Sequence, residues 1–357
     1  MKHISKKFLC GLYIVGLLII ILDFKTAAQG ASDAIELCIR TVIPSLFPFM
    51  VLSILLNSYL TGSAIRILKP IARICSIPEG CETILLLGLL GGYPVGAQSI
   101  YHAWRQKQIS TSQARRMLGF CNNAGPAYIF GMAVILFEKP VMIWAAWAIH
   151  IISAITTGII LPHSPDRSNV VPKSTEISFS CALERTIKTL SVVCGWIVLF
   201  RVMIIYLPKW FYRIFSDFTL TIMCGFLELT NGCIELYALH SQGLRFILFS
   251  TFLALGGICV AAQTISVTKG LGTGLYFPGK IMQCSISTVL ASITQCICLG
   301  QQRYIPSNAL IGLCLITAIV IRALLDKKTV AFLKSVVYNI EKYTRKGHAH
   351  AISKKAS

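Results

Sequence analysis

The sequence predicts an all-α, polytopic membrane protein of about 8–10 transmembrane segments, with a two-fold internal repeat and re-entrant hairpins. Composition is the first observation: 55% of the 357 residues are hydrophobic and only 13% are charged, whereas a soluble domain has about 25% charged residues. Spacing is the second, because the charges cluster between apolar runs that are long enough to cross roughly 30 Å of hydrocarbon. So few charges could not solvate the outside of a soluble core of this size.

Ten apolar runs are candidate spans, with ends uncertain by about two to four residues. They are Phe8–Leu22, Val42–Leu60, Thr83–Trp104, Cys121–Phe137, Val141–Leu161, Lys188–Leu207, Thr219–Leu239, Phe246–Ile265, Ile281–Leu299 and Ala309–Leu325. We interpret the first run as an uncleaved helix rather than a signal peptide, because it lacks a convincing small-residue cleavage site and another span follows soon afterwards. Two shorter stretches, 64–77 and 110–120, are typical of amphipathic helices at the membrane interface.

The longest polar connection, "PHSPDRSNVVPKSTEIS", begins at Pro162 and divides the chain. We therefore predict an N-terminal membrane half over 1–161, a connecting loop over 162–187, a C-terminal membrane half over 188–325 and a basic cytoplasmic tail over 326–357. The two halves share sequence, because "GGYPVGAQSI" at Gly91 and "GGICVAAQTI" at Gly256 agree at six of ten positions. This similarity predicts the internal repeat.

The formal net charge of +19 lies mainly in loops and in the tail, as expected for cytoplasmic segments of a membrane protein. Membrane topology is the favoured explanation of this charge, attraction of the tail to anionic membrane lipid is the alternative, and no nucleic-acid partner is expected. The 14 cysteines form no CxxC pair or zinc-type pattern, so neither a metal site nor a disulfide framework is predicted. No GxSxG, HExxH or Walker motif is present, so we predict neither an enzyme nor a cofactor. A homo-oligomer is compatible with the sequence.

The stretch "LGGYPVGAQSI" interrupts the run Thr83–Trp104 with two glycines and a proline. A bilayer offers no water to free backbone groups, so the interruption must be sheltered by protein or face an aqueous cavity. If this run crossed fully, the loop that carries Arg115 and Arg116 would lie outside, against the positive-inside rule. We therefore favour a re-entrant hairpin with GGYP at its tip and with Pro94 in the first turn of the second half-helix. Whether the copy at Gly256 does the same stays open.

Paired interruptions in two halves indicate a transporter's binding site, where helix ends can hold an anion near mid-membrane. The candidate substrate-binding residues are Gly91, Gly92, Tyr93, Pro94, Gly96, Gln98, Asn122, Asn123, Asn231, Gly256, Gly257 and Gln263. An interhelical hydrogen bond is the competing interpretation for Gln98 and Gln263. A helix cap followed by a turn is the competing interpretation for Asn122 and Asn123.

Glu228, Asn231 and Glu235 share one helix face in "GFLELTNGCIEL", through i, i+3 and i+7 spacing. A carboxylate in a bilayer is costly unless it is paired, protonated or hydrated. Glu228 is therefore the candidate for carrying a coupling proton or shaping the site, and an ion pair with Arg201 is the alternative. We expect His150, among tryptophans, to be a hydrogen-bonded interface residue.

Five motifs in order, "PSLFPFMVLSILL", "GGYPVGAQ", "CNNAGPAYIFG", "FLELTNGC" and "LGGICVAAQTISV", resemble the YlbJ/SpoVV family of sporulation integral membrane proteins over roughly residues 8–325. That family belongs to the nucleoside-recognition (Gate) domain group, related to concentrative nucleoside transporters. The resemblance implies a transporter-like fold with re-entrant hairpins. It also implies that Gly91–Gln98, Asn122, Asn123, Glu228, Asn231 and Gln263 surround the substrate path. The second copy has Ile258 and Cys259 in place of Tyr93 and Pro94, so the two tips need not act alike.

The predicted function is therefore a sporulation membrane transporter, in the bacterial cell membrane or outer forespore membrane. By the resemblance, it moves a small anionic metabolite, best matched by dipicolinic acid, through alternating access. A nucleoside or another metabolite is the alternative substrate. A scaffold that recruits sporulation proteins through the basic tail, without transport, is the competing class of function. The sequence does not identify a coupling ion.

Overall fold

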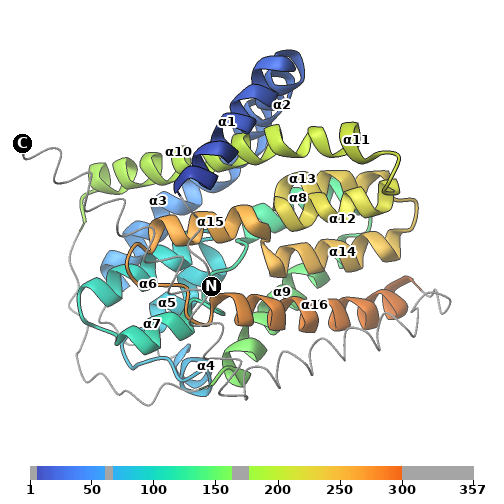
Figure 1. Cartoon of the computed structure of the whole chain (residues 1–357). Helices are drawn as coiled ribbons and strands as arrows, with labels where there is room; N and C mark the ends of the chain where they lie inside the picture. The colour runs from blue at the N-terminus through green and yellow to red at the C-terminus, as the bar shows by residue number, and fades with distance from the viewer. Residues whose placement is uncertain (1–5, 61–66, 163–176, 300–357) are drawn as a thin grey trace, which may run out of the picture.

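The computed structural model describes residues 6–60, 67–162 and 177–299, and every regular element in these ranges is a helix (Figure 1). The all-α prediction is therefore confirmed for the described part of the chain. In Figure 1, α10 (Phe179–Ile204) runs along the top of the bundle and α16 (Tyr276–Leu299) along the bottom. The predicted span Ala309–Leu325 and the basic tail lie outside the described residues.

Within the described residues, four helical segments are long and apolar enough to cross a membrane, which supports the polytopic prediction. They are Phe24–Leu56, Pro140–Ile160, Phe179–Phe211 and Gln242–Val267. The first joins α2 (Phe24–Leu37), a π-helical turn (Cys38–Val42) and α3 (Ile43–Leu60). The predicted span Val42–Leu60 is thus the second half of a longer helix, because the polar residues of α2 concealed the first half.

Two further long helices begin earlier than predicted. The helix α10, continued by α11 (Tyr206–Phe211), begins inside the predicted connecting loop 162–187. The helix α16 begins five residues before the predicted start at Ile281 and so includes Lys280. The remaining elements of the N-terminal part are α1 (Lys6–Leu22), α4 (Lys69–Ile74), α7 (Thr111–Met117), α8 (Pro126–Leu136) and α9 (Pro140–Ile160).

The predicted span Thr83–Trp104 is a pair of short helices, α5 (Glu82–Leu90) and α6 (Val95–Arg105), which pack against each other. At 1.5 Å per residue they are about 14 Å and about 17 Å long, roughly half of the hydrocarbon thickness. Pro94 is the N-cap of α6 rather than a residue of its first turn, which corrects the predicted position. We call α5, α6 and their connection hairpin 1.

A second pair of packed helices replaces the predicted span Thr219–Leu239. It consists of α12 (Asp217–Leu227) and α13 (Leu229–Glu235), which is followed by a 3-10 turn (Leu236–Ala238). The two helices approach closely through glycines, because a Cβ added to Gly232 would lie 2.1 Å from the Cα of Gly225. We call this pair hairpin 2, and its tip is Glu228.

The glycine pair at Gly256 lies in a different setting from the pair at Gly91. It joins α14 (Gln242–Leu255) to α15 (Gly257–Val267) within one candidate span, and both Gly256 (φ 76°) and Gly257 (φ 75°) adopt the left-handed region that favours glycine. The predicted copies thus interrupt the chain in two ways, one between packed helices and one inside a continuing span.

Arg116 is buried. Its predicted position in a cytoplasmic loop had implied a surface charge instead. Its guanidinium donates to the carbonyl oxygens of Cys75 (2.6 Å) and Pro162 (2.9 Å) and also to that of Gly158. The side chain is 2% exposed. Arg116 therefore fastens α7 to the C-terminal end of α9, where helix carbonyls have no intrahelical partner.

Candidate functional site

The interrupted segments of the bundle meet around a small central cavity of about 40 Å³. Its walls come from the tips of both hairpins, the stretch before α8, and the helices α3, α10 and α15. The lining residues are Val42, Leu46, Tyr93, Ala124, Gly125, Tyr128, Val193, Ile197, Glu228, Leu229, Thr230, Val260 and Gln263. One water molecule needs about 10–15 Å³ of such free volume, so the cavity has room for a few waters and is too small for a metabolite in this conformation.

Glycines allow the interrupted segments to approach this closely. A Cβ on Gly92 would lie 3.2 Å from the backbone nitrogen of Gly125, and one on Gly256 would lie 3.2 Å from the Tyr93 ring. A Cβ on Gly257 would lie 3.1 Å from the carbonyl oxygen of Phe226, near the end of α12. The Gly256–Gly257 break therefore lies against hairpin 1 on one side and hairpin 2 on the other.

Tyr93 and Lys280 form the polar cluster beside the cavity. The ammonium group of Lys280 donates to the Tyr93 hydroxyl (3.1 Å), to Asn123 Oδ1 (3.3 Å) and to Gln283 Oε1 (2.9 Å). It also lies 5.1 Å from the centroid of the Tyr93 ring, within the range of a cation–π contact. The Tyr93 hydroxyl in turn donates to the carbonyl oxygen of Leu253 (3.2 Å).

Lys280 is a buried basic group without a carboxylate partner. It is 2% exposed, and it forms no ion pair with any carboxylate of the described residues. Its three hydrogen bonds go to neutral groups, so its donors are satisfied but a positive charge on it would not be balanced. Burial disfavours the charged form of such an amine, and an anion beside it would stabilise that form.

Glu228 lines the cavity and caps α13. The carboxylate is 2% exposed and accepts from Thr230 N (3.0 Å), Asn231 N (2.7 Å) and Asn231 Nδ2 (2.7 Å). The alternative prediction, an ion pair with Arg201, is wrong, because Arg201 instead contacts Asp33 at 3.3 Å and Glu235 at 4.0 Å. The Glu228 carboxylate therefore lies at the cavity and accepts hydrogen bonds from backbone and amide donors. No cation among the described residues forms an ion pair with it.

The two asparagines of "CNNAGP" hold neighbouring segments together and do not line the cavity. Asn122 accepts from Ala97 N of α6 (3.2 Å) and donates to Thr264 Oγ1 of α15 (2.9 Å). Asn123 donates to the Phe120 carbonyl oxygen (2.7 Å), and its own oxygen accepts from Lys280 and Gln283. Neither caps α8, whose N-cap is Gly125, so the capping interpretation is wrong.

The other predicted residues divide between two places. Gln263 lines the central cavity. Gly91 packs closely against Val95, because a Cβ added to Gly91 would lie 2.7 Å from Val95 Cγ1. Gln98 instead lines a larger cleft and donates to Thr189 Oγ1 of α10 (2.7 Å). His150 accepts from Ala124 N (3.1 Å), as expected for a hydrogen-bonded residue.

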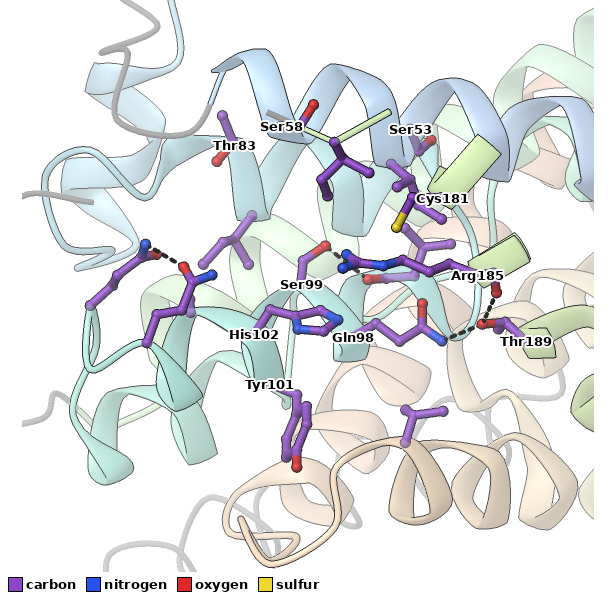
Figure 2. A pocket seen from close by; sticks show the side chains of 18 of the residues that line it. Ser53, Ser58, Thr83, Gln98, Ser99, Tyr101, His102, Cys181, Arg185 and Thr189 are labelled. Carbon is purple, nitrogen blue, oxygen red and sulfur yellow. Dashed lines mark hydrogen bonds between the residues drawn. The ribbon is translucent and has the colours of Figure 1, made fainter. Parts of the chain in front are cut away.

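The larger cleft has a volume of about 1220 Å³ and lies between α3, α6, α10 and the end of α15 (Figure 2). Ser53 and Ser58 come from α3, Gln98, Ser99 and His102 from α6, and Cys181, Arg185 and Thr189 from α10. None of the described residues that line it is acidic.

Several buried polar residues escaped the sequence-based prediction. Lys280 and Gln283 lie one turn apart near the start of α16. Lys280 immediately precedes the predicted span Ile281–Leu299, and Gln283 lies inside it, but neither was singled out as an intramembrane polar group. Glu82 is 3% exposed, and its Oε2 has no hydrogen-bond partner among the described residues. No sequence signal separated Glu82 from an ordinary helix-starting glutamate.

These features define a polytopic, all-helical integral membrane protein with polar groups gathered inside an apolar bundle. Over 111 residues the chain is 30% identical to the sporulation integral membrane protein YlbJ of Bacillus subtilis (strain 168). The aligned part covers 30% of this chain and 27% of that protein, so it spans about a quarter of the relative's length. The similarity supports the predicted family and suggests a sporulation membrane protein. No family model and no solved structure matches the chain.

Proposed function

We propose that this chain is a sporulation membrane transporter that moves a small anionic metabolite across the outer forespore membrane by alternating access. Dipicolinate, a pyridine dicarboxylate, is the proposed substrate. The observation that carries the proposal is the meeting of two hairpin tips and two helix interruptions around one small cavity, with Lys280 beside it and Glu228 in its wall. Interrupted helices that meet inside an apolar bundle are the usual architecture of a transporter's binding site.

In this proposal the two hairpins are re-entrant. Their helices have 7 to 11 residues and are therefore only about a third to a half as long as the hydrocarbon is thick, so each pair would enter and leave on one face. The tips expose backbone groups that lipid cannot satisfy. Packing Gly92 against Gly125, and Gly257 against the end of α12, shelters those groups inside the protein.

The chemistry around the cavity suits a carboxylate-bearing substrate. Lys280 supplies a buried amine with no carboxylate partner among the described residues, and a substrate carboxylate would stabilise its charged form. The helices α6 and α8 both begin beside the cavity, so the positive ends of their dipoles favour an anion there. The cavity volume of about 40 Å³ requires the tips to separate before a metabolite enters, as alternating access demands.

Glu228 has the role of a coupling group in this mechanism. An ionised carboxylate would repel an anionic substrate, whereas a protonated one removes the repulsion and can donate a hydrogen bond. Proton binding to Glu228 would then accompany substrate loading. We expect an imposed proton gradient to accelerate flux by the wild type and to have no effect on Glu228→Gln.

Flux of dipicolinate into proteoliposomes tests the proposal. We expect transport by the wild type and a loss of at least tenfold for Asn123→Ala and Glu228→Gln, because each would leave a buried partner unsatisfied, at a cost of about 1–3 kcal/mol. Glu138→Gln, an exposed carboxylate outside the site, is the matched control. Absence of wild-type flux would refute the function, and undiminished flux in both variants would refute the site.

A nucleoside is the second candidate substrate, and one observation favours it. The Glu228 carboxylate is an acceptor in the cavity wall without a neighbouring cation, which suits the hydroxyl donors of a neutral sugar. Competition separates the candidates: excess uridine should leave dipicolinate flux unchanged if the substrate is anionic, and should abolish it if the site binds nucleosides.

A further inference from the structure

The charged side chains that line the large cleft of Figure 2 are all positive. These side chains are Arg185 and Lys188 of α10 and Lys269 after α15, and the described lining includes no carboxylate. Arg185 and Lys188 are exposed, and Arg185 extends from α10 across the cleft toward Ser99 and His102 (Figure 2). A cleft lined by one sign of charge raises the local concentration of ions of the opposite sign.

Four elements line both the cleft and the central cavity. The helix α10 contributes Thr189 to the cleft and Val193, one turn further on, to the cavity. The same relation holds for α15, and for α6 together with its tip. The helix α3 contributes to both over two turns. The floor between the two spaces is therefore roughly 5–10 Å thick at 1.5 Å per residue.

The floor is closed by a contact between two of these shared walls. Gln98 Nε2 of α6 donates to Thr189 Oγ1 of α10 (2.7 Å), as Figure 2 shows. A single hydrogen bond between neutral groups contributes about 0.5–1.5 kcal/mol. Breaking this bond between α6 and α10 therefore costs little free energy. Movement of hairpin 1 away from α10 would join the cleft to the cavity.

We propose that this cleft is an anion vestibule, in which Arg185 and Lys188 bind small dicarboxylates and deliver them to the central cavity past the Gln98–Thr189 contact. The inference rests on the proposed transport function and adds the place and side of substrate entry. The cleft exceeds the roughly 300–1,000 Å³ of ordinary ligand pockets, so it accommodates a hydrated anion without stripping its water. An anionic lipid headgroup would be attracted by the same basic side chains, so the experiment must distinguish it from a free dicarboxylate.

Dipicolinate flux measured against ionic strength tests the vestibule. We compare the full-length wild type with the double variant Arg185→Gln/Lys188→Gln and with Arg213→Gln, a basic residue outside the cleft. The double variant should show a KM raised about three- to tenfold, an unchanged kcat and a weaker salt dependence, because exposed charges attract from a distance and are screened by salt. A KM and a salt dependence equal to those of Arg213→Gln would overturn the proposal.

Two further arms separate the outcomes. If the wild type transports no dipicolinate, the proposed function fails, while equilibrium dialysis of dipicolinate against detergent-solubilised protein still tests the vestibule. Weaker binding by the double variant than by Arg213→Gln supports it, and equal or absent binding overturns it. In the other arm, liposomes of phosphatidylcholine are compared with liposomes that contain phosphatidylglycerol. If the double substitution alters only the response to phosphatidylglycerol, the cleft is a lipid site and the proposal is wrong.

Discussion

The substitution Gly96→Ala tests how hairpin 1 is seated on the interrupted segment before α8. A Cβ on Gly96 would lie 2.0 Å from the carbonyl oxygen of Cys121, and one on Gly88 would lie 2.1 Å from the same oxygen. The carbonyl therefore lies in a notch formed by α5 and α6. To regain ordinary contact near 3.4 Å, the added methyl group must displace it by about 1.4 Å.

Asn122 would move with this carbonyl, and its hydrogen bonds to Ala97 and Thr264 would lengthen. Overpacking costs about 1–3 kcal/mol, and one weakened hydrogen bond adds about 0.5–1.5 kcal/mol. The matched control is Gly131→Ala, because a Cβ on Gly131 meets nothing within 4 Å. That control gains up to about 1 kcal/mol of helix propensity. The expected difference in stability between the two variants is therefore about 2–4 kcal/mol.

Thermal unfolding in detergent, followed by fluorescence of the native tryptophans, measures this difference. Gly96→Ala should unfold several degrees below the wild type, and Gly131→Ala should unfold at or above the wild-type temperature. If Gly96→Ala is as stable as Gly131→Ala, the close packing of hairpin 1 on Cys121 is not a feature of the folded protein.

Two other substitutions test the buried basic groups. Arg116→Lys should lower the stability of the solubilised protein by about 2–4 kcal/mol, because an ammonium group cannot reproduce the fork of donors to three carbonyl groups; Arg105→Lys, at an exposed position, is the control, and equal melting temperatures would contradict the prediction. Lys280→Met should weaken dipicolinate binding in equilibrium dialysis by at least tenfold, while the variant Lys269→Met, on the cleft rim, should lose less; a Lys280→Met protein that melts like the wild type and binds dipicolinate equally well would remove Lys280 from the site.

The sequence was sufficient to predict the class of fold and the points where helices break, because both depend on local composition. Apolar runs and the glycine pairs at Gly91 and Gly256 are visible without any tertiary information. What each break does was not predictable, since a folded-back hairpin and a kinked span have the same local signature. The difference arises from partners distant in sequence, such as the close approach of Gly256 to Tyr93.

Side-chain roles were harder to predict for the same reason. Glu228 was identified because a carboxylate in an apolar run is conspicuous, but its hydrogen bonds to Thr230 and Asn231 depend on the helix starting at Leu229. Lys280 was missed because it lies at the edge of an apolar run, where a lysine normally reaches the interface. Its burial results from packing against Tyr93 and Asn123, residues more than 150 positions away.

Hairpin 1 is held both by apolar packing, since Leu85, Ala97 and Ile100 lie in the core, and by a small set of polar contacts. Its tip and second helix are joined to the rest of the bundle through Tyr93 to Leu253, Lys280 to Tyr93, Ala97 to Asn122 and Gln98 to Thr189. At about 0.5–1.5 kcal/mol each, with somewhat more for the bond from a charged Lys280, these bonds together amount to a few kcal/mol. A ligand can shift an equilibrium only by its difference in affinity for the two states, and a difference of about 5.5 kcal/mol reverses a 99:1 population. In the proposed mechanism, an anion that binds Lys280 in place of Tyr93 would contribute to such a difference, because it would give the buried amine a charged partner in place of a neutral one. The same lysine would then both recognise the substrate and release the hairpin.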